Sequence, residues 1–189
     1  FGLGHTLYVH RAKLGGILNG VDYEVWNPEI DRHLPRPYSL NHLDAKYENK
    51  HALRQRFWLQ DAYKPIVCYI GRLDHQKGVP LITHALHYCL QHGTQFVLLG
   101  TSPNGGIGHH FWRLKQLYND NPDCHLELSF NEELSHLVYA GAEMIIVPSL
   151  FEPCGLTQMI ALKYGTVPIV RATGGLADTV FDANYADRP

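Results

Sequence analysis

Cysteine is scarce in this sequence, since four occur among 189 residues and none forms a Cys-x-x-Cys pair. Such sparse usage argues against a disulfide scaffold or a zinc ribbon and is typical of a reducing compartment. Long apolar runs are absent as well, because no stretch approaches the roughly 20 apolar residues that cross a bilayer. We therefore expect a soluble protein with no membrane partner.

An excess of either charge is also lacking. Sixteen Lys and Arg residues face eighteen Asp and Glu residues, so the formal net charge is −2. A chain that binds nucleic acid or an anionic membrane through its overall field is strongly basic, and this one is not. Any anion that it binds must be held by a few local cations, and we expect no nucleic-acid partner.

Several familiar motifs are missing. Gly-x-x-x-x-Gly-Lys-Ser/Thr does not occur, and no Gly-x-Gly-x-x-Gly follows an expected strand, which weakens the interpretation as a kinase, NTPase or dinucleotide enzyme. We interpret the glycine-rich run 105–108 as a loop that begins a helix. Thirteen histidines raise the question of a metal site, yet His-Glu-x-x-His is absent and no Cys or carboxylate is spaced to complete one. We predict surface and helix histidines, no metal and no cofactor.

The length suits one domain, because a chain of this size hides about 70% of its unfolded surface without disulfides. Both ends nevertheless look cut. Phe1 is not an initiator methionine, and the sequence stops at Pro189 without a closing element. We expect a piece of a longer protein.

From residue 61 onward, short apolar runs alternate with stretches of helical periodicity. The expected strands are 66–70, 95–99, 126–128, 144–147 and 167–170, and the expected helices are 80–90, 110–118, 132–140, 155–164 and 175–181. Strands that are apolar throughout are covered on both faces, and helices between them are how parallel strands are connected. We predict an α/β fold with a doubly wound, Rossmann-like parallel sheet over residues 61–189.

The first third of the chain is less regular. Residues 1–28 are expected to form an inter-domain segment with a short strand at Ile17-Leu18 and a turn at Asn19-Gly20. Residues 29–60 are expected to be a surface connection followed by an amphipathic helix near 46–59.

In doubly wound sheets, ligands lie outside the carboxyl ends of the strands. The first strand-to-helix turn runs from Gly71 to Gly78 and holds two cations, Arg72 and Lys77. A guanidinium and an ammonium near a helix start form a phosphate-binding arrangement, although two such residues in a loop are often simply solvated.

The second turn, 148–158, places Glu152 just before a helix. Glu152 either is the acidic residue that a helix start favours, or accepts hydrogen bonds from a polar ligand while the N–H groups of Gly155, Leu156 and Thr157 face its phosphate. The third turn, 171–176, repeats the design of strand, glycines and helix start. Three turns of one kind together favour a ligand site over three coincidences.

Taken together, these motifs resemble the C-terminal half of the starch and glycogen synthases, which are retaining glucosyltransferases of the GT-B fold. The motifs match in order and spacing and cover nearly the whole chain: Asn19-Gly20-Val21-Asp22 with Trp26-Asn27-Pro28, Gly71-Arg72-Leu73 with Gln76-Lys77-Gly78, Leu134-Ser135-His136, Phe151-Glu152-Pro153-Cys154-Gly155-Leu156-Thr157-Gln158, and Thr173-Gly174-Gly175-Leu176. The connecting segment and Val180-Phe181-Asp182 look more similar to soluble starch synthases of plants and algae than to bacterial glycogen synthases.

The resemblance implies transfer of glucose from ADP-glucose to the non-reducing end of an α-1,4-glucan with retention. It assigns catalytic roles to Glu152, Arg72 and Lys77, of which the two cations would hold the diphosphate and stabilise departing ADP. Phe130 would stack on adenine, and Glu152 would contact the donor glucose. The remaining residues that it assigns to donor binding are Cys154, Gly155, Leu156, Thr157 and, at the edge of the cleft, Asn19.

Two departures from the family pattern qualify these expectations. The position eight residues after Glu152, acidic in many GT-B enzymes, is Ile160, an absence that starch synthases share. The N-terminal GT-B domain and the closing C-terminal helix are not in this chain, so the isolated fragment is expected to be inactive. Two alternatives stay open: a non-catalytic glucan-binding or scaffolding module, and a related enzyme that uses UDP-glucose. The resemblance places the protein in a plastid, chloroplast or amyloplast, or in the cytoplasm if the source is bacterial.

Overall fold

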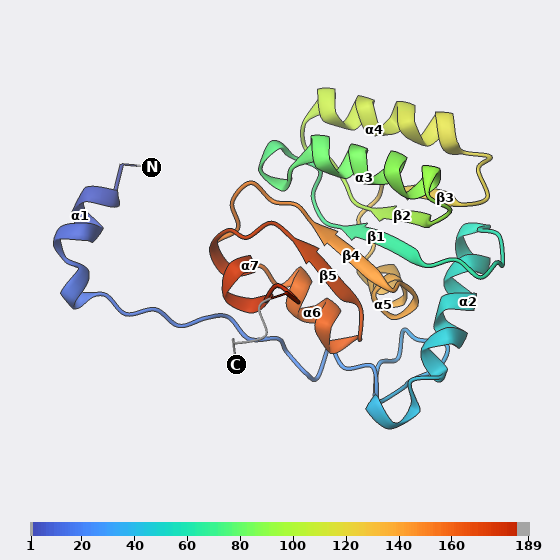
Figure 1. Ribbon diagram of the computed structural model, residues 1–189, viewed down its shortest axis with the longest axis horizontal. Helices are drawn as coiled ribbons and strands as arrows, with labels where there is room; N and C mark the ends of the chain where they lie inside the picture. The colour runs from blue at the N-terminus through green and yellow to red at the C-terminus, as the bar shows by residue number, and fades with distance from the viewer. Residues whose placement is uncertain (1, 185–189) are drawn as a thin grey trace.

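The computed structural model describes residues 2–184 and contains a five-stranded parallel sheet with the order β3-β2-β1-β4-β5 (Figure 1). The strands are β1 (Ile66–Ile70), β2 (Gln95–Leu99), β3 (Cys124–Glu127), β4 (Met144–Val147) and β5 (Val167–Val170). The order changes direction between β1 and β4, which makes the sheet doubly wound. The predicted fold class is confirmed.

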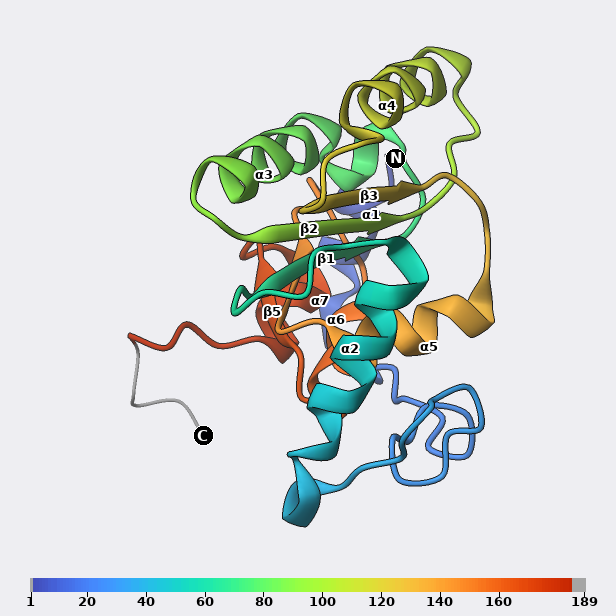
Figure 2. The same cartoon turned by 90° about the vertical axis from the view of Figure 1, so that its right-hand side faces the viewer.

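Helices cover both faces of the sheet. α3 (Val79–Gln91) and α4 (Gly105–Tyr118) lie on one face, while α2 (Ala45–Phe57), α5 (Glu132–Gly141), α6 (Thr157–Lys163) and α7 (Gly174–Thr179) lie on the other (Figure 2). Alternate side chains of β1 supply the two cores: Val67 and Tyr69 pack with α3 and α4, and Ile66 and Cys68 pack with the helices of the second face. This double burial explains why the strands are apolar throughout.

The strand predictions hold almost everywhere. Four of the five strands begin and end at the predicted residues, and β3 begins at Cys124, two residues before its prediction. α4 begins within the glycine-rich run because the Asn104 side chain accepts hydrogen bonds from the N–H groups of Gly106, at 3.0 Å, and Ile107, at 3.2 Å. That contact is an N-cap, so the whole run 105–108 is helical rather than a loop, and α4 begins five residues before the predicted start at 110.

Two predictions for the first third of the chain are wrong. Ile17 and Leu18 form no strand and are 98% and 60% exposed, because the segment 14–20 runs in extended form past the sheet edge with no strand to pair with (Figure 1). The connection after residue 28 is not merely superficial, since Asp31, Leu34 and Tyr38 are buried against the second face. The buried residues fasten this segment to the sheet domain.

The N-terminal residues stand apart from the sheet. α1 (Gly4–Val9) and a 3₁₀ turn, Arg11–Lys13, have no buried residue, and a second 3₁₀ turn, Leu40–His42, precedes α2. No helix in the described part of the chain combines the length and apolar character that a membrane span requires. The stretch 186–189, on which the expectation of a missing closing element rests, lies outside the described residues.

Candidate functional site

The first two predicted turns are joined by their backbones at the carboxyl edge of the sheet. The N–H of Leu150 donates to the carbonyl oxygen of Gln76 at 2.8 Å, and the Gln76 side chain donates to the carbonyl oxygen of Phe151 at 3.1 Å. Gly78 has φ +75°, and a Cβ atom there would lie 2.3 Å from the carbonyl oxygen of Pro148. Only glycine permits this approach without displacement of the second turn.

This junction brings two predicted site residues into direct contact. The Lys77 ammonium forms an ion pair with the Glu152 carboxylate, and the hydroxyl of buried Ser149 donates to the same carboxylate oxygen at 3.0 Å. Both charged side chains are mostly buried, so the contact is only partly screened by water. A positive and a negative group thus lie side by side where the ends of β1 and β4 meet.

The third turn contacts the second through backbone groups. The N–H of Gly175 donates to the carbonyl oxygen of Glu152 at 2.8 Å, and a Cβ at Gly174, where φ is +48°, would lie 2.3 Å from that oxygen. Gln158 is fully buried, and its amide donates to the carbonyl oxygen of Gly155 at 2.9 Å and to the hydroxyl of Thr179 at 3.0 Å. The three turns are therefore joined by direct contacts. These contacts could not be predicted from the sequence.

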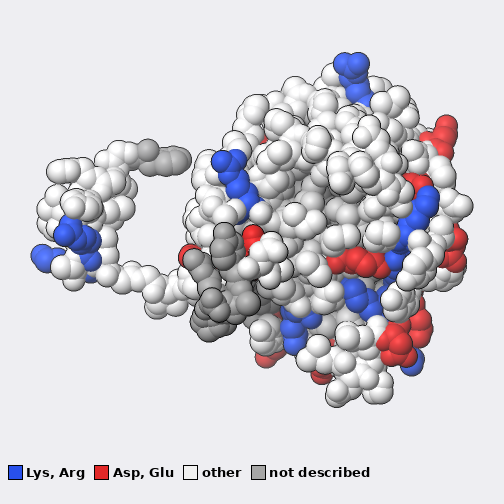
Figure 3. Space-filling model, in the orientation of Figure 1, with Lys and Arg blue, Asp and Glu red and all other residues white. Residues whose placement is uncertain are grey.

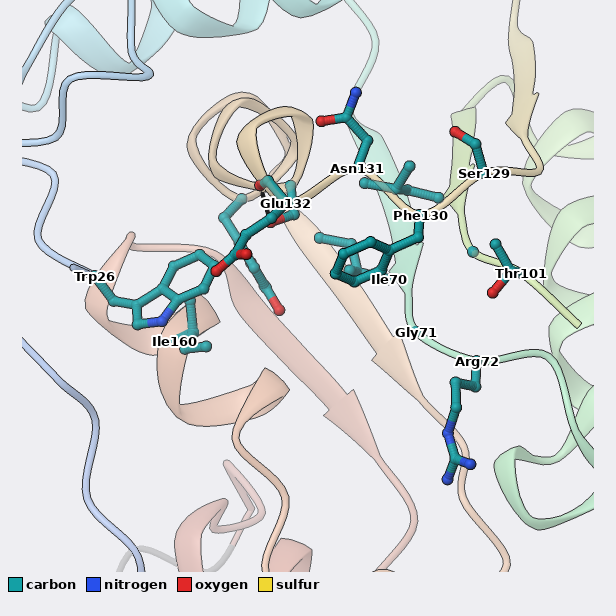
Figure 4. A pocket seen from close by; sticks show the side chains of 14 residues that line it. Trp26, Ile70, Gly71, Arg72, Thr101, Ser129, Phe130, Asn131, Glu132 and Ile160 are labelled. Atoms are coloured by element: carbon teal, nitrogen blue, oxygen red, sulfur yellow. Dashed lines mark hydrogen bonds between the residues drawn. The ribbon is translucent and has the colours of Figure 1, made fainter. Parts of the chain in front are cut away.

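A cavity of about 310 Å³ opens beside these turns (Figure 4). Its walls are largely apolar, with Ile70 and Phe130 on one side and Trp26 and Ile160 on the other, and Arg72 lies at its rim. The Arg72 guanidinium is 64% exposed and lies 3.6 Å from the Asp74 carboxylate. Phe130 is 84% exposed, so its ring is available to a planar ligand. The structure therefore brings Arg72 and Phe130 to one cavity.

The other predicted site residues lie in two different parts of the chain. Cys154, Gly155 and Leu156 form the loop that precedes α6, whose first residue is Thr157, two residues later than the predicted helix start. Asn19 lies in the exposed extended segment, away from the cavity lining. Lys77, Glu152 and the residues from Cys154 to Thr157 do not line the cavity either, so Arg72 and Phe130 are the predicted site residues that do.

Sequence reasoning missed one wall of the cavity, Trp26. The Trp-Asn-Pro motif drew attention to this residue, but its contact with the cavity follows from tertiary packing of segments far apart in the sequence. Among residues 2–184, no three His, Cys, Asp or Glu side chains converge as metal ligands would. Several histidines stack on aromatic rings instead, as His92 does on Tyr88 at 3.9 Å between centroids.

A doubly wound sheet with two cations and a carboxylate on its carboxyl-edge turns is an arrangement typical of α/β proteins that bind phosphorylated ligands. The family model described as "Glycosyl transferases group 1" matches residues 54–186. The chain belongs to this family of glycosyltransferases.

Comparison with individual proteins narrows the family to more specific relatives. The chain is 67% identical over 189 residues to glycogen synthase 1 of Nitrosococcus oceani, covering 100% of this chain and 39% of the relative. It is 64% identical over 184 residues to the probable glycogen synthase 2 of a Nostoc species, covering 97% and 37%. The chain therefore spans less than two fifths of the length of these relatives.

A solved structure gives the same result for the fold. The catalytic domain of starch synthase IV from Arabidopsis thaliana, bound to ADP and acarbose, superposes with a TM-score of 0.96 at 47% identity, over 100% of this chain and 38% of that one. Sucrose-phosphate synthase from Thermosynechococcus elongatus has a TM-score of 0.54 at 32% identity, over 69% and 33%. The predicted resemblance to starch and glycogen synthases is confirmed.

One part of the resemblance needs correction. We expected greater similarity to plant and algal starch synthases than to bacterial glycogen synthases, yet the two bacterial relatives are 67% and 64% identical and the plant enzyme is 47% identical. These relatives give no support to a plastid or chloroplast location.

Proposed function

We propose that the chain is the donor-binding part of a glucan synthase, which transfers glucose from ADP-glucose to the non-reducing end of an α-1,4-glucan with retention. The observation that carries the proposal is the pairing of Lys77 with Glu152 where the first two turns meet, together with Arg72 of the first turn at the rim of a cavity that contains Phe130. The identity to bacterial glycogen synthases supports the glucan-synthesising activity and a bacterial cytoplasmic location.

The geometry suggests how the charges divide between the two parts of the donor. Arg72 at the cavity rim and Lys77, five residues later in the same turn, are the cations that would hold the diphosphate and stabilise the negative charge that grows on ADP as it leaves. Glu152 would accept hydrogen bonds from the donor glucose. Its ion pair with Lys77 holds the two charged groups next to each other where the first two turns meet.

The turns of this site are held together by hydrogen bonds within the chain. Ser149 and the backbone of Gly175 fix the Glu152 side chain and carbonyl group, and Gln76 ties the first turn to the second. A carboxylate oriented in advance loses less conformational freedom when the donor arrives, which favours catalysis. The acceptor glucan and the remainder of the longer protein would complete the cleft, and domain closure would exclude water.

Calorimetric titration of the chain with ADP tests donor binding. We expect binding by the unmodified chain and an affinity at least tenfold weaker in Lys77→Ala, since a charge-assisted hydrogen bond contributes about 1.5–3 kcal/mol. Competition between ADP and UDP then decides the nucleotide. Failure of a folded chain to bind ADP, or an unchanged affinity in Lys77→Ala, contradicts the proposal.

Activity of the longer protein tests the role of Glu152. We expect Glu152→Ala to reduce turnover by at least about a hundredfold, the usual loss when a group that stabilises the transition state is removed. ADP affinity should stay within several-fold, because the nucleotide contacts other residues. Near-normal turnover would remove Glu152 from the catalytic residues and favour a non-catalytic module.

A further inference from the structure

Trp26 forms a wall of the cavity, and an unusual set of contacts holds it there. Its indole lies parallel to the His136 imidazole, with 4.1 Å between ring centroids and an interplanar angle of 9°. The edge of Tyr139 meets it at 5.7 Å and 85°. Across the cavity from Trp26 lies Phe130 (Figure 4). Two aromatic rings from segments about a hundred residues apart therefore face one space.

His136 is buried and its ring is held in turn by Asp31. Nδ1 of His136 lies 2.7 Å from Oδ2 of Asp31, and the Tyr164 hydroxyl donates to the same oxygen at 2.5 Å. The N–H of His33 donates to the other carboxylate oxygen at 2.9 Å. Because a carboxylate only accepts hydrogen bonds, Nδ1 of His136 must carry the hydrogen, which fixes the ring plane against which Trp26 lies.

These contacts attach the segment from Val21 to Tyr38 to the two helices behind the cavity. Trp26 and Asp31 contact His136 of α5, and the Tyr38 hydroxyl donates to the carbonyl oxygen of Tyr164, just after α6, at 2.8 Å. Pro28 and Leu34, between these anchors, are buried. The segment is thus fixed at three points, and one of these fixed points faces the candidate nucleotide cavity.

We propose that Trp26 contacts the nucleoside of the bound nucleotide, with His136 and Asp31 as positioning residues that hold the indole at the cavity wall. The inference rests on the proposed function, since it takes the cavity as the nucleoside site. Trp26, Ile160 and Phe130 give the cavity apolar surfaces on which a planar base can stack, and the Glu132 side chain lies between Trp26 and Phe130 (Figure 4). Arg72, the cation for the phosphates, lies at the rim rather than at the Trp26 wall.

A purine is expected to lie between the Phe130 and Trp26 walls. Stacking of a base on an aromatic side chain is sensitive to loss of that ring, typically by about tenfold or more in affinity. His136 and Asp31 do not line the cavity, so changes there reach the ligand indirectly, through the placement of Trp26.

The native tryptophan provides a first test that leaves this wall unaltered. Trp58 and Trp112 are exposed and do not line the cavity, so Trp58→Phe with Trp112→Phe leaves Trp26 as the single reporter. We expect its fluorescence to change in a saturable way on titration with ADP and to stay unchanged with inorganic pyrophosphate. A folded double variant that binds ADP by calorimetry without any change in Trp26 emission overturns the inference.

Affinities of variants provide the second test. Trp26→Ala is expected to weaken ADP binding about tenfold and Trp26→Phe less than threefold, while His136→Gln and Asp31→Asn weaken it several-fold. Pyrophosphate affinity should stay within twofold in all four, because it depends on Arg72 and Lys77. Loss of ADP affinity with retained pyrophosphate affinity is a split that general loosening of the fold would not produce, and Trp112→Ala is the matched control with no expected effect.

The outcomes separate this inference from the proposed function. If Lys77→Ala weakens ADP binding and Trp26→Ala does not, the role of Trp26 is overturned and the donor-binding function stands. If ADP and pyrophosphate affinities fall together in the Trp26 and His136 variants, these residues are structural only. If the folded, unmodified chain binds no ADP, both proposals are overturned.

Discussion

The two edges of the sheet use their arginines in opposite ways. At the amino edge, where the strands begin, Arg54 donates to the Gln95 amide oxygen at 2.9 Å, to Asp61 at 3.0 Å and to the carbonyl oxygen of Lys64 at 2.9 Å. Lys50 pairs with Glu143 at 2.5 Å, just before β4. On this flank, acidic and basic side chains lie next to one another (Figure 3). These charges are occupied by protein partners.

At the carboxyl edge, the arrangement leaves charge available. Arg72 is mostly exposed and lies 3.6 Å from Asp74, whereas Lys77 is paired with Glu152 of the second turn. Backbone hydrogen bonds join the turns here, and the Lys77–Glu152 pair adds a contact between the first two. A chain near neutrality can therefore still present local positive charge, because Arg72, unlike Arg54, is not used for packing.

The largest change in stability is expected from a substitution at the amino edge. Arg54→Met removes three hydrogen bonds and leaves the amide oxygen of fully buried Gln95 unpaired, so we expect a loss of about 3 kcal/mol in the free energy of unfolding. Urea denaturation measures this loss, and ADP affinity of the folded fraction should stay within twofold.

Arg36→Met is the matched control for this variant. Arg36 lies 3.7 Å from Glu48 with both side chains more than 60% exposed, so its removal should change stability by less than about 0.5 kcal/mol. Equal losses in the two variants would mean that the buried arginine contributes no more than a solvated one.

The carboxyl edge should show the reverse pattern, with a smaller free-energy change that appears in binding. Arg72→Ala is expected to weaken ADP and pyrophosphate affinity between about ten- and a hundredfold, because one charge-assisted contact is lost, while stability changes by less than about 0.5 kcal/mol. Calorimetry and urea denaturation of the same sample separate the two. Arg72→Lys should restore part of the affinity, since the charge remains but the planar fork is lost.

Much of this arrangement could be predicted from local pattern. The strands 66–70 and 95–99 are continuous apolar runs between glycine or polar boundaries, and the structure places them as predicted. Ile17-Leu18 satisfies the same local rule and forms no strand, because a strand needs a neighbour to pair with and sequence pattern does not supply one.

The candidate site likewise has features that could be predicted from local sequence and features that could not. Arg72, Lys77 and Glu152 were predicted because each lies in a strand-to-helix turn. The ion pair between Lys77 and Glu152, and the stack of Trp26 on His136, join residues 75 and 110 positions apart, so they depend on how the sheet brings the turns together. Local sequence carries residue type and turn geometry, and such contacts emerge only from tertiary packing.

The smallest effect concerns Asp31, which belongs to neither edge but holds the segment that ends at Tyr38. Burial raises the pKa of Asp31, but hydrogen bonds from His136, Tyr164 and the N–H of His33 outweigh it and hold that pKa below its usual value. A depressed folded-state pKa adds stability that is complete above the unfolded value of about 3.9 and is lost as the pH falls through the folded value.

We expect Asp31→Asn to cost about 1–2 kcal/mol at neutral pH. The difference from the unmodified chain should shrink as urea denaturation is repeated from pH 5 toward pH 3. Exposed Asp120 is the control, because Asp120→Asn should run parallel to the unmodified chain throughout. A pH-independent difference for Asp31→Asn would show that the carboxylate charge does not hold this segment in place.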